Sequence, residues 1–361
     1  MNKVTIDGTL YHREELCKRT PAPFAADSPS HRQLSLFLKE WFSPTPVLTL
    51  HTSGSTGRPK EITVRKEQML QSAAITCDFF GMKAGERALL CLPLQYIAGK
   101  MMVVRAIYAG LNLLVAEPSG HPLAGIPQRV DFAAMVPLQV YNSLQTDNEQ
   151  ARLSRVARLI IGGGAIDQAI EERLRYFPNA IYSTYGMTET VSHIALRRIS
   201  GVKADDCYTP LPGVTLRLSE EQTLIVDAPR VADGILHTND IAEMRPDGSF
   251  RILGRKDNVI NSGGIKIQIE EVEKALRPHI SGDFAITSVP HPRLGEAVVL
   301  LIGPGSDPDR VREAVSQHLP RVQQPLYLLS VEAVPHTGNG KTDRTASKIM
   351  ASEKIQMPGI R

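Results

Sequence analysis

Hydroxyl side chains, glycines and cations crowd into residues 52–60, which read Thr52-Ser53-Gly54-Ser55-Thr56-Gly57-Arg58-Pro59-Lys60. The hydroxyls, the cations and the backbone N–H groups of such a segment can all donate hydrogen bonds to an anion, which is typical of a phosphate-binding turn. Taken alone, the same composition also fits a flexible surface turn with a solvated lysine. A further observation is needed to decide between the two.

Two other glycine-rich segments fail the standard nucleotide-binding motifs. Gly340-Lys341-Thr342 resembles the end of a P-loop, but the first glycine position of G-x-x-x-x-G-K-[ST] holds Pro335, which has no N–H to donate. Gly162-Gly163-Gly164 fails the dinucleotide fingerprint, because Asp167 occupies the third glycine position. Neither standard nucleotide fold explains three separate glycine loops and an isolated lysine near residue 341.

Up to about residue 205, apolar strands, glycine-containing turns and amphipathic helices alternate, which is the pattern of an α/β architecture. The phosphate-binding turn is expected to run from a strand to a helix. We expect strands at 47–51, 88–93, 112–116 and 158–161, and helices at 66–79, 99–108 and 168–176.

Beyond residue 205 short strands and turns predict hairpins, one of them turning at Asp247–Gly248. A helix from Ile267 then carries Ile269, Val272 and Leu276 on one face. Strands at 283–289, 297–302 and 326–331 and helices at 310–318 and 345–353 complete the tail. The expected fold class is α/β: a large multi-layer α/β domain over 1–256 and a small α+β domain over 257–361.

Composition excludes several classes of protein. The 361 residues suit two domains, and a net charge of +3 with interspersed charges argues against a nucleic-acid partner or a stable membrane association. No signal peptide is seen, and no apolar run approaches the ~18 residues that cross a bilayer. The four cysteines, Cys17, Cys77, Cys91 and Cys207, lie far apart and are expected to be free thiols in a cytoplasmic protein.

Five segments, in order, resemble the signature motifs of the adenylate-forming (AMP-binding) superfamily of acyl-CoA synthetases, luciferases and peptide-synthetase adenylation domains. They are TSGSTGRPK (52–60), YGMTET (185–190), TND (238–240), GRKDNVINSGGIKI (254–267) and PHTGNGKTDR (335–344). The resemblance implies that family's fold and an ATP-dependent, AMP-forming carboxylic acid–CoA ligase. It also implies Mg²⁺ as cofactor and CoA as cosubstrate.

By this resemblance, one set of residues would bind the nucleotide. Gly163 and Gly164 would let the backbone approach adenine, Tyr185 would stack on the ring, and Gly186 belongs to the same signature. The β- and γ-phosphates would be held by Thr52, Ser53, Gly54, Ser55, Thr56, Gly57 and Lys60.

A second set would serve catalysis. Thr188 would contact the α-phosphate, and Glu189 would bind Mg²⁺, a hard cation suited to carboxylate oxygen. Asp240 would accept hydrogen bonds from the ribose hydroxyls, with Arg255 assisting. Lys341 would bridge the substrate carboxylate and the α-phosphate as charge develops between them.

The resemblance further implies a hinge at Asp257, about which the small domain rotates between an adenylating and a thioester-forming pose. Lys341 would leave the site in the second pose. VPHPRLGEAVV (289–299) resembles a segment of acyl-CoA synthetases and favours CoA over a carrier protein as acceptor.

Segments 93–110, 159–167 and 185–196 look most like the o-succinylbenzoate–CoA ligases of menaquinone biosynthesis. o-Succinylbenzoate, the acid on which those ligases act, carries a second carboxylate. Arg105 stands where those ligases have an arginine, and a guanidinium could bind this carboxylate bidentately. A surface helix cation is the competing interpretation of Arg105. His193 and Tyr96 would line the acyl pocket, although a core or surface histidine fits His193 equally well.

Some questions stay open from the sequence. Only about 50 residues precede the phosphate loop, far fewer than in most members, so part of the first layer is expected to be missing or replaced. Another aryl or acyl acid–CoA ligase, or an adenylation enzyme that loads a carrier protein, fits the same motifs. A non-catalytic nucleotide-binding relative is disfavoured by the intact Lys60, Glu189, Asp240 and Lys341. The sequence also leaves open a homodimer.

Overall fold

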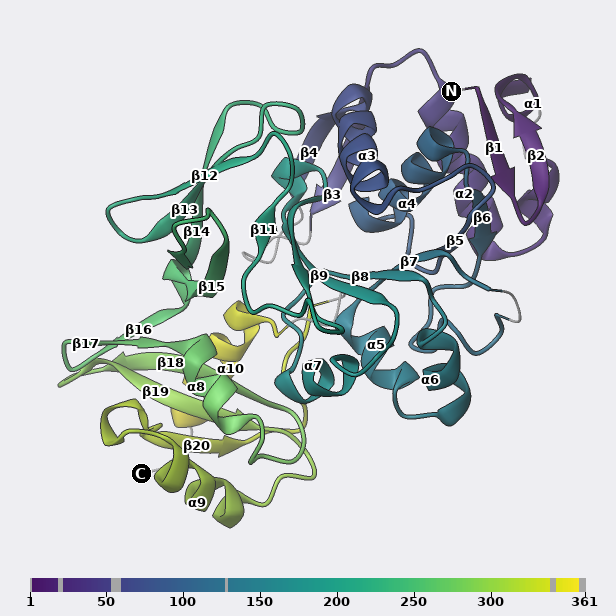
Figure 1. The fold of residues 1–361 in the computed structure, drawn as a ribbon. Helices are drawn as coiled ribbons and strands as arrows, with labels where there is room; N and C mark the ends of the chain where they lie inside the picture. Colours follow the sequence, from purple (N-terminus) through teal and green to yellow (C-terminus); the bar gives the residue numbers. More distant parts are fainter. Residues whose placement is uncertain (1, 19–21, 53–59, 127–128, 338–341, 357–361) are drawn as a thin grey trace.

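The computed structural model describes residues 2–18, 22–52, 60–126, 129–337 and 342–356. Within these ranges a nine-stranded sheet organises the larger part of the molecule (Figure 1), in the order β11-β10-β9-β8-β7-β5-β6-β1-β2. Its parallel strands are β1 (Lys3–Ile6), β5 (Arg87–Leu90), β6 (Asn112–Val115), β7 (Phe132–Met135), β8 (Arg158–Ile161) and β9 (Ala180–Gly186). Antiparallel strands β2 (Thr9–His12), β10 (His193–Arg198) and β11 (Thr209–Pro210) close the two ends.

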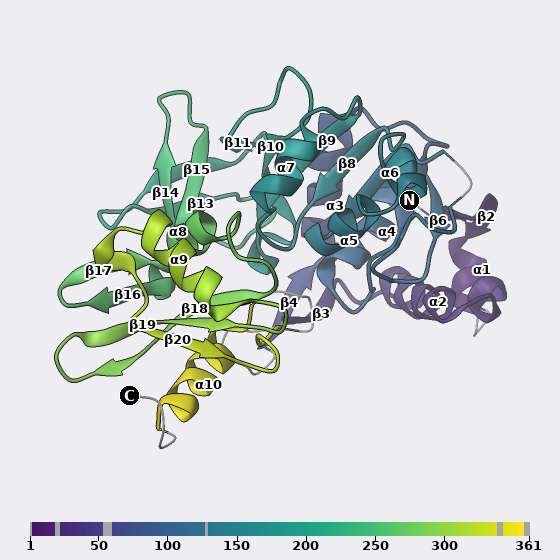
Figure 2. The same ribbon diagram turned by 90° about the horizontal axis from the view of Figure 1, so that it is seen from below.

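Alternation along the strands creates two cores, one on each face of the sheet. In β5, Ala88 and Leu90 belong to one apolar cluster and Leu89 to the other. The first cluster includes residues of α2 (Pro29–Phe42), α3 (Lys66–Phe80) and α4 (Ile97–Ala109). The second includes residues of α5 (Pro137–Ser143), α6 (Asp147–Leu153) and α7 (Gln168–Leu174). Helices therefore cover both faces of the sheet, as the two views show (Figures 1 and 2).

The order of the strands indicates where a ligand would bind. β5 pairs with β6 on one side and with β7 on the other, so the chain reverses its winding direction between β5 and β7. In doubly wound sheets ligands bind outside the carboxyl ends of the strands at such a switch point. The segments that follow β5, β7, β8 and β9 all emerge at this edge.

The first 46 residues extend the large domain. β1 adds to the sheet beside β6, with Thr5 opposite Asn112, and β2 pairs with β1. α1 (Arg13–Lys18) and the 3-10 helix η1 (Pro23–Ala26) lead into α2, whose Leu34, Phe37 and Leu38 are buried. This short segment thus supplies two strands and a core helix to the layer in which the short N-terminal region predicts missing or replaced parts.

One expectation about the phosphate loop is wrong. Residues 53–59 connect β3 (Val47–Thr52) to a second strand, β4 (Lys60–Arg65), and not directly to a helix. The two strands are antiparallel, with Thr52 opposite Lys60 and Val47 opposite Arg65. Ile62 and Val64 alternate with polar residues, and this period of two, typical of a strand, is the signal for β4 in the sequence.

Two smaller sheets follow and lie to the left of the large sheet in Figure 1. The first contains β12 (Thr215–Leu218), β13 (Thr223–Asp227), β14 (Ile235–Met244) and β15 (Phe250–Arg255). The predicted turn is confirmed between β14 and β15, where Gly248 has φ +82° and donates to the carbonyl of Arg245. Positive φ at this position favours glycine.

The second small sheet begins after the 3-10 helix η3 (Lys256–Asn258). Helix α8 (Ile269–Leu276) buries Ile269, Val272 and Leu276, as its spacing predicts. The fold is a large α/β domain with a small α+β C-terminal domain. Its remaining elements are β16 (Val259–Ser262), β17 (Ile265–Gln268), α8 (Ile269–Leu276), β18 (Phe284–His291), β19 (Gly295–Ile302), α9 (Pro308–His318), η4 (Arg321–Gln323), β20 (Tyr327–Ser330) and α10 (Arg344–Gln356).

Two simpler expectations can also be checked. All four cysteines are free thiols, and three of them are buried. Within the described ranges, every helix is too short or too polar to cross a membrane.

Candidate active site

Two of the predicted segments lie side by side at the carboxyl edge of the large sheet. Gly162–Gly164 follows β8, and Tyr185 and Gly186 end the adjacent parallel strand β9. Thr188 and Glu189 come next, in the 3-10 helix η2 (Thr188–Thr190). Parallel pairing of β8 with β9 therefore brings residues more than 20 positions apart to one edge.

The glycines at this edge have structural reasons for their identity. Gly163 has φ +87°, which a side chain would strain. A Cβ on Gly162 would lie 2.4 Å from Oγ1 of Thr184, and a Cβ on Gly186 would lie 2.4 Å from the carbonyl oxygen of Ser192. Glycine therefore lets the Gly186 backbone pass close to the Ser192 backbone, and leaves room for the Thr184 side chain beside Gly162.

Tyr185 and Asp240 join the large sheet to the four-stranded sheet. The Tyr185 hydroxyl donates a 2.6 Å hydrogen bond to Oδ2 of Asp240 on β14. Burial, helped by the nearby negative charge of Asp240, holds the pKa of Tyr185 well above its ordinary value. The phenol therefore stays protonated as a donor, and its ring packs edge-on against Phe250 with 5.3 Å between centroids.

Arg255 links Asp240 to the predicted hinge residue Asp257. Its Nη1 donates to Oδ1 of Asp240 at 3.1 Å, while Nε and Nη2 each donate to Asp257 at 2.9 Å. Burial opposes ionisation of Asp257, but the hydrogen bonds and charge of Arg255 outweigh it and lower the pKa of that carboxyl. A carboxylate has about four acceptor positions, so Asp240 can still accept two more donors.

The loop from Met187 to Ser192 is held in a strained form. Val191 has φ +64° and ψ −48°, and the N–H of Ser192 donates to the carbonyl of Thr190 across 2.6 Å. This is the geometry of a γ-turn that costs energy for a β-branched residue. The Thr190 hydroxyl fixes the loop from inside, because it accepts from the Met187 N–H at 3.1 Å and lies 2.8 Å from the Ser192 carbonyl oxygen.

Glu189 projects from this loop. The residue is exposed and, within the described part of the chain, its side chain makes no hydrogen bond or ion pair. Its carboxylate is thus available as an oxygen ligand, beside the half-buried Thr188. Groups of three or more His, Cys, Asp or Glu that could hold a metal on their own are absent from the residues that the structure describes.

Arg105 is not a surface cation, because only 2% of it is exposed on α4. Its Nη2 donates to Oγ of Ser192 at 2.9 Å, and its Nε has no hydrogen-bond partner in the described ranges. Among the described residues, the one partner of Nη1 is the sulfur of Met102, at 3.9 Å. Burial lowers the pKa of Arg105 to about 10, which still leaves a cation at neutral pH.

His193 is buried beside Arg105 and uses both ring nitrogens inside the protein. Its Nε2 lies 3.1 Å from Oγ1 of Thr76 on α3, and its Nδ1 lies 3.4 Å from Oγ of Ser192. Ser192 and Thr76 were not among the predicted site residues, although Ser192 comes only two residues after the signature YGMTET. Tyr96, the third predicted acyl-pocket residue, is half-buried and occupies the N-cap position of α4, without a capping hydrogen bond from its side chain.

Several predicted residues lie outside the described ranges: Ser53, Gly54, Ser55, Thr56, Gly57 and Lys341. The side chains of Thr52 and Lys60 are also outside the description. The ends of the Lys341 segment are well anchored. The Asp343 N–H donates to the Pro335 carbonyl at 2.9 Å, and Arg344 pairs with both oxygens of Glu273 at 2.6 and 2.7 Å.

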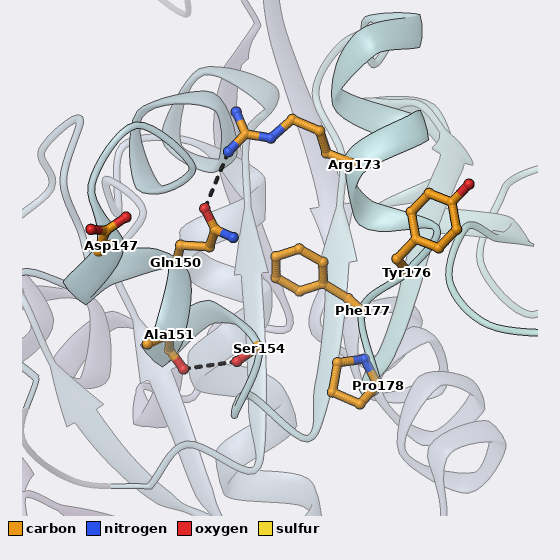
Figure 3. A pocket seen from close by; sticks show the side chains of 8 residues that line it. All are labelled: Asp147, Gln150, Ala151, Ser154, Arg173, Tyr176, Phe177 and Pro178. Atoms are coloured by element: carbon orange, nitrogen blue, oxygen red, sulfur yellow. Dashed lines mark hydrogen bonds between the residues drawn. The ribbon is translucent and has the colours of Figure 1, made fainter.

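An open hollow of about 550 Å³ lies elsewhere, between α6 and α7 (Figure 3). Arg173 donates to Gln150 across it, and Tyr176, Phe177 and Pro178 form its apolar side. None of the predicted site residues lines this hollow.

Comparisons with known proteins agree with the site's motifs. A family model described as AMP-binding enzyme matches residues 3–239. The probable 2-succinylbenzoate–CoA ligase of Mycobacterium tuberculosis is 27% identical over 326 residues, which is 83% of this chain and 83% of that protein.

Solved structures show the same likeness. An acyl-CoA synthetase (AMP-forming)/AMP-acid ligase II-like protein from Dyadobacter fermentans is 32% identical with a TM-score of 0.61, over 89% of this chain and 94% of that one. O-succinylbenzoate coenzyme A synthetase from Bacillus subtilis, in complex with ATP and magnesium ion, gives a TM-score of 0.70 at 19% identity, over 82% of this chain and 68% of that one. At that identity the second likeness concerns the fold.

Proposed function

The chain belongs to the AMP-binding enzyme family, and we propose that it activates 2-succinylbenzoate (o-succinylbenzoate) with ATP and transfers the acyl group to CoA. The products would be o-succinylbenzoyl-CoA, AMP and pyrophosphate, as in menaquinone biosynthesis. The broader class is an AMP-forming acid–CoA ligase. The choice of acid rests on the burial of Arg105.

The observation that carries the choice is the buried cation Arg105. It is 2% exposed and has no ion pair among the described residues, and its Nε has no hydrogen-bond partner there. Burying a charge without a counter-ion costs free energy, unless a bound ligand supplies the opposite charge. A carboxylate fits a guanidinium in shape and charge, so an acid with a second carboxylate would complete the site, whereas a fatty acid would leave it unpaired.

We assign the nucleotide to the edge where Tyr185 and Asp240 meet. Asp240 retains acceptor capacity for two ribose hydroxyls while Tyr185 and Arg255 hold its carboxylate in place. The open backbone at Gly163 and Gly164 would face adenine, with Tyr185 against the ring and Gly186 beside it. The hairpin loop from Thr52 to Lys60 would bind the β- and γ-phosphates.

In the first step, an oxygen of the aliphatic carboxylate attacks the α-phosphorus and pyrophosphate leaves. Two anions approach each other, so the enzyme's contribution is positioning and charge stabilisation. Thr188 would hold an α-phosphate oxygen, and Lys341 would lie between the two reacting anions. The exposed carboxylate of Glu189 fits Mg²⁺, which would neutralise charge on the phosphates.

In the second step, the CoA thiolate attacks the acyl carbonyl carbon and AMP leaves. We propose that the domain boundary lies between residues 256 and 257, so that rotation about Asp257 withdraws Lys341 and admits the thiol. Arg255 would then give up its bidentate contact with Asp257 for another partner. The presence of this contact at the proposed pivot supports a hinge role for the pair.

The direct test is incubation of the purified protein with ATP, Mg²⁺, CoA and o-succinylbenzoate, followed by mass spectrometry of the thioester. Formation of o-succinylbenzoyl-CoA supports the proposal. Conversion of benzoate or fatty acids instead would show that the acid is wrong. An acyl adenylate that accumulates with CoA but is consumed by a phosphopantetheinyl carrier protein would show that the acceptor is wrong.

A further inference from the structure

A chain of hydrogen-bonded groups starts at the buried Arg105 and connects three elements of the large domain. It passes from α4 to Ser192 and His193 at the start of β10, and from there to Thr76 on α3. The successive distances are 2.9, 3.4 and 3.1 Å. Thr76 ends the chain by donating to the carbonyl of Ser72 at 3.0 Å.

The direction of this chain follows from which groups carry protons. A guanidinium can only donate, so Ser192 Oγ accepts from Arg105. The Thr76 hydroxyl donates its one proton to the Ser72 carbonyl. In the contact between Thr76 and His193, Nε2 of His193 must therefore be the donor and the Thr76 oxygen the acceptor. Nδ1 is then unprotonated and accepts the hydroxyl proton of Ser192. With the opposite tautomer, the Ser192 hydroxyl proton would have no acceptor among the described residues.

Charge excludes the doubly protonated imidazole. His193 is 8% exposed, and burial, with the positive charge of Arg105, holds its pKa well below the ordinary value. The Cys77 thiol on α3 lies next to Arg105, and burial raises its pKa to about 11, so it supplies no compensating negative charge at neutral pH. The cluster thus carries one positive charge, that of Arg105.

The geometry points to His193 as a positioning residue: as the neutral Nε2–H tautomer it accepts, at Nδ1, the hydrogen bond that the Ser192 hydroxyl donates, which turns the Ser192 oxygen toward Arg105 and leaves the other guanidinium N–H groups for the substrate's second carboxylate. This inference rests on the proposed function of Arg105. His193 therefore acts through Ser192 and does not itself contact the acid, and Thr76 selects its tautomer.

The tautomer can be tested without any substrate. Nitrogen-15 NMR of the histidine-labelled full-length protein would assign His193 by the loss of its signals in His193→Gln. We expect one protonated Nε2 and one bare Nδ1 between pH 6 and 8. An imidazolium or an Nδ1–H tautomer in that range would overturn the inference.

Kinetics test the consequence for binding. In Thr76→Val the Nε2–H loses its acceptor, so the other tautomer gains population and competes for the Ser192 oxygen. We expect the KM for o-succinylbenzoate to rise about three- to tenfold, the size of one lost buried hydrogen bond, with kcat and the KM for ATP within about twofold. Thr76→Ser keeps the hydroxyl and should restore the KM. Thr287→Val, at a buried threonine of β18, is the matched control.

A parallel measurement on Arg105→Met separates the two proposals. If Arg105→Met loses preference for the dicarboxylate while Thr76→Val keeps the wild-type KM, the positioning role of His193 is wrong and the proposed function stands. If Arg105→Met keeps the wild-type preference, the proposed role of Arg105 fails, and with it the role of His193 in binding.

Discussion

The hydroxyl of Tyr185 lies 2.6 Å from the carboxylate of Asp240, and this contact joins β9 of the nine-stranded sheet to β14 of the four-stranded sheet. Asp240 is held on its other oxygen by Arg255 at 3.1 Å. A carboxylate fixed from two sides is preorganised to accept the two hydroxyls of a ribose, because it loses little freedom when they bind.

Tyr185→Phe removes one of these constraints and keeps the ring. We expect the KM for ATP to rise about three- to tenfold, since one hydrogen bond to a charged group is lost, with the KM for the acid unchanged. Steady-state kinetics would measure both constants, with ATP varied at saturating acid and CoA, and with the acid varied at saturating ATP and CoA. Tyr176→Phe, at a residue that is 87% exposed, is the control. An unchanged KM for ATP would argue against a ribose at Asp240.

Lys341→Ala tests the proposed first step. Removal of one preorganised charge from a reaction centre slows chemistry by about 10²–10³-fold, so single-turnover pyrophosphate release should slow by that factor. Thioester formation from synthetic acyl adenylate should continue at nearly the wild-type rate, because the lysine has then left the site. Lys83→Ala, at an exposed residue, is the control. Equal loss in both half-reactions would contradict the assignment.

Glu273→Gln tests how the end of the Lys341 segment is anchored. Glu273 binds Arg344 through both oxygens and also accepts the Ile286 N–H at 2.9 Å. Breaking this partly buried pair leaves Arg344 without its anion, so we expect the free energy of unfolding to fall by about 2–4 kcal/mol. Urea unfolding would measure it. Asp309→Asn breaks an exposed pair with Arg312 and should cost about 0.5 kcal/mol or less.

The low pKa of His193 makes stability depend on pH in a defined direction. An unfolded histidine titrates near pH 6.5, whereas folded His193 stays neutral well below that value. Below about pH 6.5 the unfolded chain binds the extra proton, so the stabilisation is complete above that pH and is lost as the pH falls. His193→Gln should flatten this slope by up to about 1.4 kcal/mol per pH unit. Thermal unfolding between pH 5 and 7.5 would measure it, with His12→Gln on β2 as the control.

Much of the fold follows from local sequence patterns. The apolar spacing of Ile269, Val272 and Leu276 predicts α8, and the run at 158–161 predicts β8 to the residue. Long-range pairing does not follow in the same way. β1 joins the sheet beside β6, more than 100 residues later, and nothing in either segment specifies that partner.

The site residues divide along the same line. Gly162–Gly164 and the signature at 185–190 can be identified from the sequence alone, and the pairing of β8 with β9 brings them together. The γ-turn at Val191 is not predictable, because a β-branched residue disfavours positive φ and tertiary contacts hold it there. The burial of Arg105, which decides between the carboxylate partner and the surface cation, also has a signal in the sequence: α4 is apolar on all sides around it, from Met101 to Ile107, and such a helix belongs inside a protein.

The preference for a second carboxylate is the central claim, and competition between two acids measures it most directly. Wild-type protein would be given o-succinylbenzoate or 4-oxo-4-phenylbutanoate, which lacks only the aryl carboxylate, and kcat/KM compared for thioester formation. We predict a preference on the order of 10³-fold or more for the dicarboxylate, because the analogue leaves buried Arg105 unpaired, and loss of most of that preference in Arg105→Met. Equal kcat/KM values for the two acids in the wild-type protein would contradict the account.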